Sequence, residues 1–125
     1  MLEFKSSDNG ATIQFSTISS SNDGTDFNVE VKCPFGSAKT QSSTYFYGSP
    51  ALLFRAMAEE WKGWKGEKSW NDLENALTLK ANSDSLGHKK LAVKLSDYES
   101  SFETLFIFEA RQLESMSNEI AAYLP

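Results

Sequence analysis

The chain has 125 residues, of which 40% are hydrophobic and 23% are charged, values typical of a soluble globular domain and not of a disordered or fibrous protein. A chain of this length can bury roughly two thirds of the surface that its unfolded form exposes, so we expect a single domain over residues 1–125. Cys33 is the only cysteine, which excludes an internal disulfide and a cysteine-cluster zinc site.

Neither a membrane-spanning segment nor a secretion signal is recognisable in the sequence. No run approaches the roughly 20 apolar residues of a transmembrane helix. Residues 1–5 lack the basic-then-apolar order of a signal peptide. We therefore expect a cytoplasmic protein that does not bind membranes.

The formal net charge of −5 is confined to residues 97–125. Through Ser96 eleven acidic residues balance eleven basic ones, whereas six acidic residues and only one basic residue, Arg111, follow. A negative field repels phosphate backbones and attracts basic surfaces, which argues against nucleic-acid binding and for a cationic partner. The alternative interpretation is that a soluble domain simply keeps its net charge away from zero.

Alternating apolar residues separated by turn formers predict four strands in the first half of the chain, at residues 2–5, 12–18, 27–33 and 37–47. Asn9-Gly10 between the first two segments is a good hairpin signal, and we expect a polar loop at residues 19–24. The fourth strand is polar at first and ends in Tyr45, Phe46 and Tyr47, which favours an edge strand whose last residues are buried.

A helix is predicted from Ser49-Pro50 to Gly63, because Ser49 supplies an N-cap hydroxyl and proline is well suited to the first helical position. Leu53, Met57 and Trp61 form its apolar stripe. Further along, Ser69 with Asp72 resembles a capping box and indicates a single helical turn through Glu74.

The second half predicts a hairpin, a strand and a helix. Apolar residues alternate at 77–81 and at 91–95, and Gly87 between them is expected in the left-handed conformation. The near-continuous apolar run Phe102–Phe108 predicts a strand that is buried on both faces and central to its sheet. One face of the terminal helix carries the apolar residues Leu113, Met116, Ile120, Tyr123 and Leu124. The expected fold is α+β, with an antiparallel sheet of about six to seven strands, two helices packed on one side, and the order ββββ-α-βββ-α.

All three tryptophans, Trp61, Trp64 and Trp70, lie within ten residues, which marks either a core seam or a contact surface. Interleaved lysines resemble a nucleic-acid stacking platform, but neighbouring glutamates make the local charge about neutral. We expect Trp61 to complete the helix stripe, and Trp64 and Trp70 to fold the following loop onto the sheet. Trp64, between two Lys-Gly pairs, is expected to be the most exposed of the three.

Groups that could support catalysis are scarce. His88 is the only histidine, and it lies close enough in sequence to Asp84 for an Asp-His pair. The alternative is that Asp84 bonds the backbone of its own turn and that Gly87 and His88 are structural residues of the hairpin. This alternative is favoured because no serine or cysteine is placed to act as nucleophile. No metal-binding, phosphate-binding or cofactor motif is present, so we expect neither a metal nor a cofactor and no enzymatic activity.

Residues 61–95 resemble the core signature of a bacterial family of uncharacterised function that is similar to the WapI-type immunity proteins. The resemblance rests on the motifs Trp61-Lys62-Gly63-Trp64, Gly66-Glu67-Lys68-Ser69-Trp70, Leu73-Glu74, Leu77, Leu79 and Ser85-Leu86-Gly87-His88, followed by a strand, Gln112 and a helix within 102–124. It implies a small cytosolic antidote that binds and blocks a cognate toxin domain, often a nuclease, without catalysis. The first 48 residues depart from the family's pattern. The resemblance therefore does not identify the partner.

Two hypotheses of different class follow. The first is an immunity-type protein that neutralises a basic toxin domain through a partner-binding surface, for which we select Trp64, Glu99, Glu103, Glu114 and Glu119. The alternative is a small-molecule-binding or enzymatic module with a pocket near Trp64 and His88.

Overall fold

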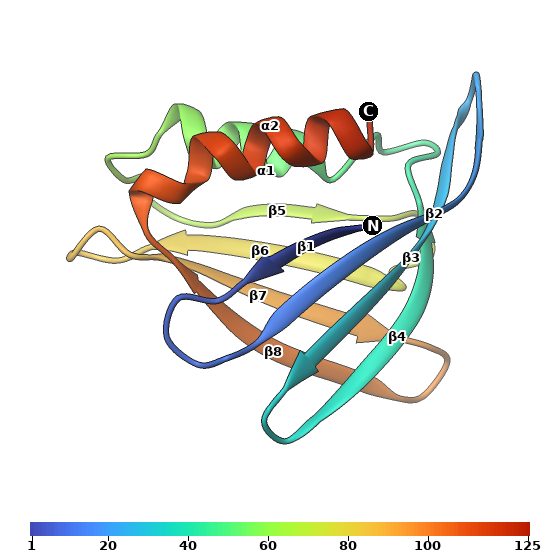
Figure 1. Cartoon of the computed structure of the whole chain (residues 1–125), viewed down its shortest axis with the longest axis horizontal. Coiled ribbons are helices and arrows are strands. Elements are labelled where there is room, and N and C mark those ends of the chain that lie inside the picture. The colour runs from blue at the N-terminus through green and yellow to red at the C-terminus, as the bar shows by residue number, and fades with distance from the viewer.

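The computed structural model describes residues 1–125 and contains eight strands and two α-helices (Figure 1). The strands are β1 (Leu2–Lys5), β2 (Thr12–Ser21), β3 (Gly24–Cys33), β4 (Gly36–Ser43), β5 (Lys68–Asn71), β6 (Leu77–Ser83), β7 (Lys89–Ser96) and β8 (Ser101–Phe108). The helices are α1 (Ala51–Glu59) and α2 (Leu113–Tyr123), and a 3-10 turn, η1 (Ala110–Gln112), leads into α2.

The α+β class is confirmed, but the expected single sheet of six to seven strands is wrong. The strands form two antiparallel sheets of four, in the orders β1-β2-β3-β4 and β5-β6-β7-β8. The second sheet gains its fourth strand at β5, where the sequence predicted a helical turn at Ser69–Glu74. Trp70 pairs with Leu79 across β5 and β6, and its burial on that strand outweighs the local capping signal.

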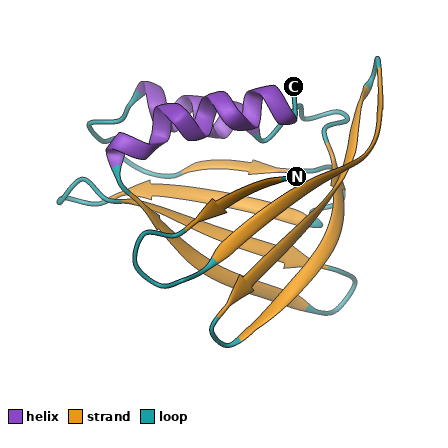
Figure 2. Cartoon of the chain, viewed as in Figure 1, coloured by secondary structure: helices purple, strands orange, loops and turns teal.

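Both helices lie on the same side of the strands, as predicted (Figure 2). α1 begins one residue later than predicted, because Pro50 and not Ser49 is its N-cap and no side chain caps the helix. Ser49 Oγ accepts a hydrogen bond from the backbone N–H of Ala51 at 3.0 Å. The buried apolar residues of both helices join those of both sheets in one core of 24 residues. On α2, the predicted face holds for Leu113, Met116, Ile120 and Leu124, whereas Tyr123 is only half-buried.

α1 ends earlier than the apolar stripe predicted. Its last helical residue is Glu59, so Trp61 leaves the helix and is 53% exposed. Gly63, expected to end the helix, lies in the following loop with a φ of 134°. The stripe therefore contains Leu53 and Met57 but not Trp61.

β4 also ends earlier than predicted. Its last residue is Ser43, and Tyr45, Phe46 and Tyr47 form a turn in which Gly48 donates its backbone N–H to the carbonyl of Thr44 at 3.1 Å. Phe46 has a φ of 70° and is 83% exposed. The aromatic residues that predicted a buried strand end thus lie partly in solvent.

β8 lies at the edge of its sheet and not in the centre. Phe106 and Phe108 are buried, whereas Leu105 is 43% exposed. Buried and more exposed residues therefore alternate along this part of β8, and the strand is not buried on both faces. The segment after β1 covers the free edge: the Ser7 N–H donates to the Ile107 carbonyl at 2.8 Å, and Asn9 Nδ2 donates to the Leu105 carbonyl at 2.7 Å. An edge covered in this way resists pairing with another chain.

Candidate functional site

The tryptophan segment separates into an exposed residue and two enclosed ones. Trp70 is 6% exposed on β5, and Trp64 is half-buried between two lysines. The Nζ atoms of Lys68 and Lys89 lie 5.3 and 5.7 Å from the Trp64 ring centroid, within cation–π range. The expectation that Trp64 is the most exposed tryptophan is therefore wrong, and Trp61 takes that place.

Lys89 is fully buried, which no local sequence pattern predicts. Its Nζ donates to the Gly87 carbonyl at 2.8 Å and to Ser83 Oγ at 3.2 Å. A buried ammonium without a carboxylate partner is costly unless its donors are satisfied, and these two acceptors and the Trp64 face do so. The Lys89 and Trp64 side chains thus stabilise each other beneath the β6–β7 hairpin.

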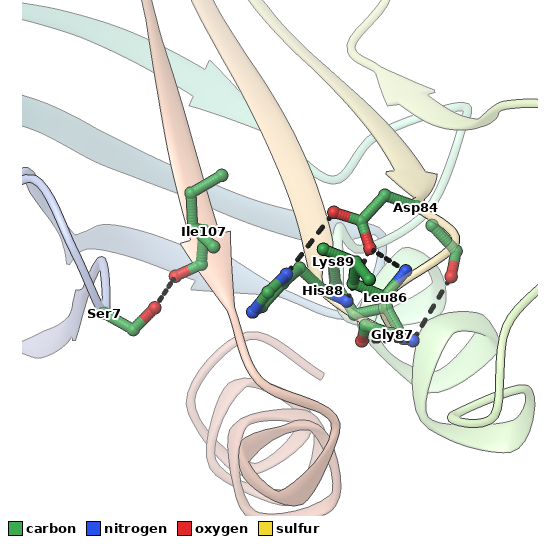
Figure 3. Close-up of polar contacts among 8 residues, drawn as sticks. Ser7, Asp84, Leu86, Gly87, His88, Lys89 and Ile107 are labelled. Carbon is green, nitrogen blue, oxygen red and sulfur yellow. Dashed lines mark hydrogen bonds and ion pairs between the residues drawn. The ribbon is translucent and has the colours of Figure 1, made fainter.

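The β6–β7 turn has the expected conformation. Gly87 has a φ of 89°, and Asp84 Oδ1 accepts hydrogen bonds from the backbone N–H groups of Leu86 and His88, each at 2.9 Å (Figure 3). Asp84 also makes the pair weighed as an alternative, because its Oδ2 lies 3.4 Å from His88 Nδ1. The carboxylate therefore orders the turn and orients the imidazole at the same time.

Several contacts determine the protonation of Asp84. Desolvation opposes ionisation, but the two backbone N–H groups and the nearby His88 imidazole outweigh it, so that the pKa of Asp84 lies below its ordinary value of 3.8. The carboxylate is consequently ionised at neutral pH and is suited to accept hydrogen bonds, not to donate a proton.

A cavity of about 380 Å³ opens beside this pair. Its lining includes Ser7, Asp84, His88 and Glu109 but not Trp64, so the structure does not join Trp64 and His88 in one pocket. Ser7 Oγ donates to the Ile107 carbonyl at 3.0 Å, while His88 turns to Asp84 (Figure 3). A serine whose proton is held by a carbonyl and not by the histidine is not arranged as an activated nucleophile.

The four selected glutamates are all exposed but do not form one surface. Glu99 and Glu103 lie at the β7–β8 hairpin, where β8 begins. Glu114 and Glu119 lie on α2, which follows the opposite end of β8 (Figure 1). They can contribute to a long-range negative field, but not together to a single contact patch.

A cavity of about 640 Å³ lies between the two helices, and we call it the helix groove. It is lined by Arg55, Ala58, Glu59, Trp61, Ala110, Arg111, Glu114, Ser117 and Asn118. Of the four selected glutamates and three tryptophans, it contains Glu114 and Trp61. The sequence missed the groove because its walls come from segments far apart in the chain.

A second cavity, of about 470 Å³, lies where the β4–α1 turn meets the β5–β6 turn, and we call it the acidic pocket. Its lining is Asp26, Gln41, Ser42, Ser43, Tyr45, Phe46, Asp72, Leu73 and Glu74. The lining contains three carboxylate side chains and no lysine, arginine or histidine. Asp72 is 3% exposed and is held by the Ser42 hydroxyl and by the Ala76 N–H at 2.8 Å.

The sequence contained one signal for the acidic pocket, the aromatic run at 45–47, but this run was interpreted as a strand. No group of three or more potential ligands is arranged to hold a metal ion. No helix has both the length and the hydrophobicity needed to cross a membrane.

Residues 4–125 match a family of unknown function, DUF6228. A comparison with curated proteins found no match. The expected membership of an uncharacterised family is thus confirmed, and nothing in the match connects the chain with WapI-type immunity proteins. Because the match spans nearly the whole chain, the protein belongs to the DUF6228 family.

Proposed function

We propose that the protein is a non-catalytic binding domain that docks a basic surface of a partner protein onto the acidic pocket. The observation that carries this proposal is the composition of the pocket, in which three carboxylates face two exposed apolar side chains and no basic residue compensates them. Such a surface complements a lysine or arginine side chain set in an apolar patch.

Two of the three carboxylates of the pocket, those of Asp26 and Glu74, are available to a cation. Asp26 accepts only a hydrogen bond from Ser19 Oγ at 3.2 Å, and Glu74 forms no ion pair with any basic residue of the chain. Asp72 is buried at the base, where its two oxygens accept hydrogen bonds from Ser42 Oγ and the Ala76 N–H, so it contributes a fixed negative charge and not a free acceptor. A guanidinium or ammonium group entering the pocket would therefore meet preorganised, uncompensated negative charge.

The apolar part of the surface is equally accessible. Phe46 is 83% exposed and Leu73 is 50% exposed, and both line the pocket. Tyr47, which follows Phe46 in the chain, is 55% exposed. Phe46 has a φ of 70°, a strained backbone conformation for a bulky residue. Strained backbone and exposed aromatic side chains are both features of recognition sites. Phe46 is the natural aromatic anchor of an interface.

We further propose that the partner is the basic toxin domain of a competition system, neutralised by occlusion of its active site. The resemblance of residues 61–95 to immunity proteins and the surplus of negative charge in residues 97–125 support this choice. In this scheme Glu99, Glu103, Glu114 and Glu119 accelerate encounter by long-range attraction, and the acidic pocket determines residence time.

The proposal contains no catalytic step, because the Ser7 hydroxyl beside the Asp84–His88 pair donates to the Ile107 carbonyl and not to the imidazole. The alternative, a small-molecule-binding or enzymatic module at the cavity beside His88, makes a different prediction. His88→Ala should abolish the activity of such an enzyme, whereas it should leave binding of a toxin partner unchanged.

Binding kinetics of the full chain with the toxin domain encoded next to its gene test the proposal. We expect Phe46→Ala and the double variant Asp26→Asn/Glu74→Gln each to weaken binding by at least about tenfold, mainly through faster dissociation. Leu86→Ala is the matched control, because Leu86 is also apolar and is 81% exposed but lies on the β6–β7 turn. Changing the four glutamates to glutamine should slow association and reduce its dependence on salt.

Two results would contradict this scheme. Wild-type affinity in both pocket variants would place the docking surface elsewhere. Failure of the neighbouring toxin domain to bind the unmodified chain would overturn the toxin assignment itself.

A further inference from the structure

The helix groove has a chemistry different from that of the acidic pocket. Both arginines of the chain, Arg55 and Arg111, line it, together with its most exposed tryptophan, Trp61. Its volume of about 640 Å³ is in the range of small-molecule sites, roughly 300–1,000 Å³. We propose that the groove is a binding site for a planar, apolar molecule that carries one carboxylate.

The anion-binding group in this proposal is Arg55. Arg111 is occupied, because its Nε lies 2.6 Å from Glu109 Oε2. Arg55 is exposed and forms no ion pair, although Glu59 follows it by one helical turn. An unpaired guanidinium presents a rigid fork of N–H donors that matches a carboxylate in geometry.

Ser117 supplies a second polar group of the groove. It is 8% exposed as a residue and lines the groove. Its hydroxyl can donate a hydrogen bond to, or accept one from, a polar atom of a ligand placed in the groove. Arg55 comes from α1 and Ser117 from α2, so one bound molecule can contact both walls.

The remaining side chains limit what the ligand can be. Trp61, 53% exposed, offers an aromatic face for stacking by a flat apolar group. Glu59 and Glu114 also line the groove without ion-pair partners and would repel a multiply charged phosphate ester. The combination favours a single negative charge on an aromatic body.

Binding of 1-naphthoate to the full chain, with 1-naphthylmethylamine as the matched cation, tests the inference. The readouts are tryptophan fluorescence and the NMR shifts of the Trp61 indole N–H and of the α1 and α2 amides. We expect saturable binding of naphthoate, with shifts confined to the groove, and at least ~10-fold weaker binding of the amine.

Variants separate the groove from general adhesion to apolar surface. Arg55→Gln should weaken naphthoate binding by ~10-fold and should leave the amine unaffected. Ser117→Ala should weaken naphthoate binding by a smaller factor. Lys94→Gln, which removes an exposed cation from β7, is the control and should change nothing.

Equal binding of acid and amine, no binding of naphthoate, or unchanged affinity in Arg55→Gln would each overturn the inference. These outcomes are independent of the toxin proposal, because the acidic pocket and the helix groove have no residue in common.

Discussion

Trp61 and Trp64 are three residues apart and have similar neighbours in sequence, yet the structure places them in opposite environments. Trp61 is 53% exposed and lines the helix groove, and its one cation–π contact is with Lys62 Nζ, 5.5 Å from the ring centroid. Trp64 lies between Lys68 and the fully buried Lys89. The difference arises from the β6–β7 hairpin, a distant segment that contributes Lys89. Exposure of an aromatic residue is therefore decided by what the fold brings to it and not by its flanking residues.

The largest effect is expected from removing the enclosed tryptophan. Trp64→Ala should lower the free energy of unfolding by about 2–4 kcal/mol, because it deletes a large aromatic contact and leaves the Lys89 ammonium buried without the ring face. Trp61→Ala, the matched control, should change it by less than about 0.5 kcal/mol, as is usual for surface positions. Urea denaturation of both variants measures the contrast. Equal losses of unfolding free energy in the two variants would contradict the difference in environment between Trp61 and Trp64.

A second experiment separates the charge of Lys89 from its apolar stem. Lys89→Met preserves most of the buried volume but removes the donor to the Gly87 carbonyl and to Ser83 Oγ. We expect a loss of about 1–3 kcal/mol in the free energy of unfolding, because these acceptors lose their partner. The exposed neighbour Lys90→Met is the control and should have little effect. A stabilised Lys89→Met variant would show that the desolvation of the ammonium outweighs its contacts.

Much of the fold could be predicted from the sequence because strands and hairpins have local signals. Alternation located the hairpin of β6 and β7, and Gly87 has the left-handed conformation that its turn requires. The terminal helix face was correct for Leu113, Met116 and Ile120. Errors arose where tertiary contacts overrode a local pattern. β5 replaced a helical turn because Trp70 is buried on the sheet, and β8 became an edge strand because the chain has no further strand to pair with it.

The candidate sites were less predictable than the fold. The acidic pocket depends on a contact between Ser42 and Asp72, and the helix groove requires α1 and α2 to lie side by side. Neither proximity follows from spacing along the chain. The unusual φ of Phe46, which exposes its ring, is set by the turn after β4 and has no signature in residue type.

The smallest effect on stability is expected at Asp84. This residue orders the β6–β7 turn, which precedes Lys89, the buried partner of Trp64. Its pKa is lowered in the folded state, so its stabilising contribution is present above the unfolded-state pKa of about 4 and is lost as the pH falls through the lower folded-state value. Asp84→Asn should therefore be less stable than the wild type at pH 7, and the gap should narrow below pH ~4. Asp97→Asn, which alters the turn between β7 and β8, controls for the loss of a surface carboxylate. Urea midpoints measured across this pH range provide the test, and a gap that stays constant down to the acid limit would show that ionisation of Asp84 contributes nothing to the turn.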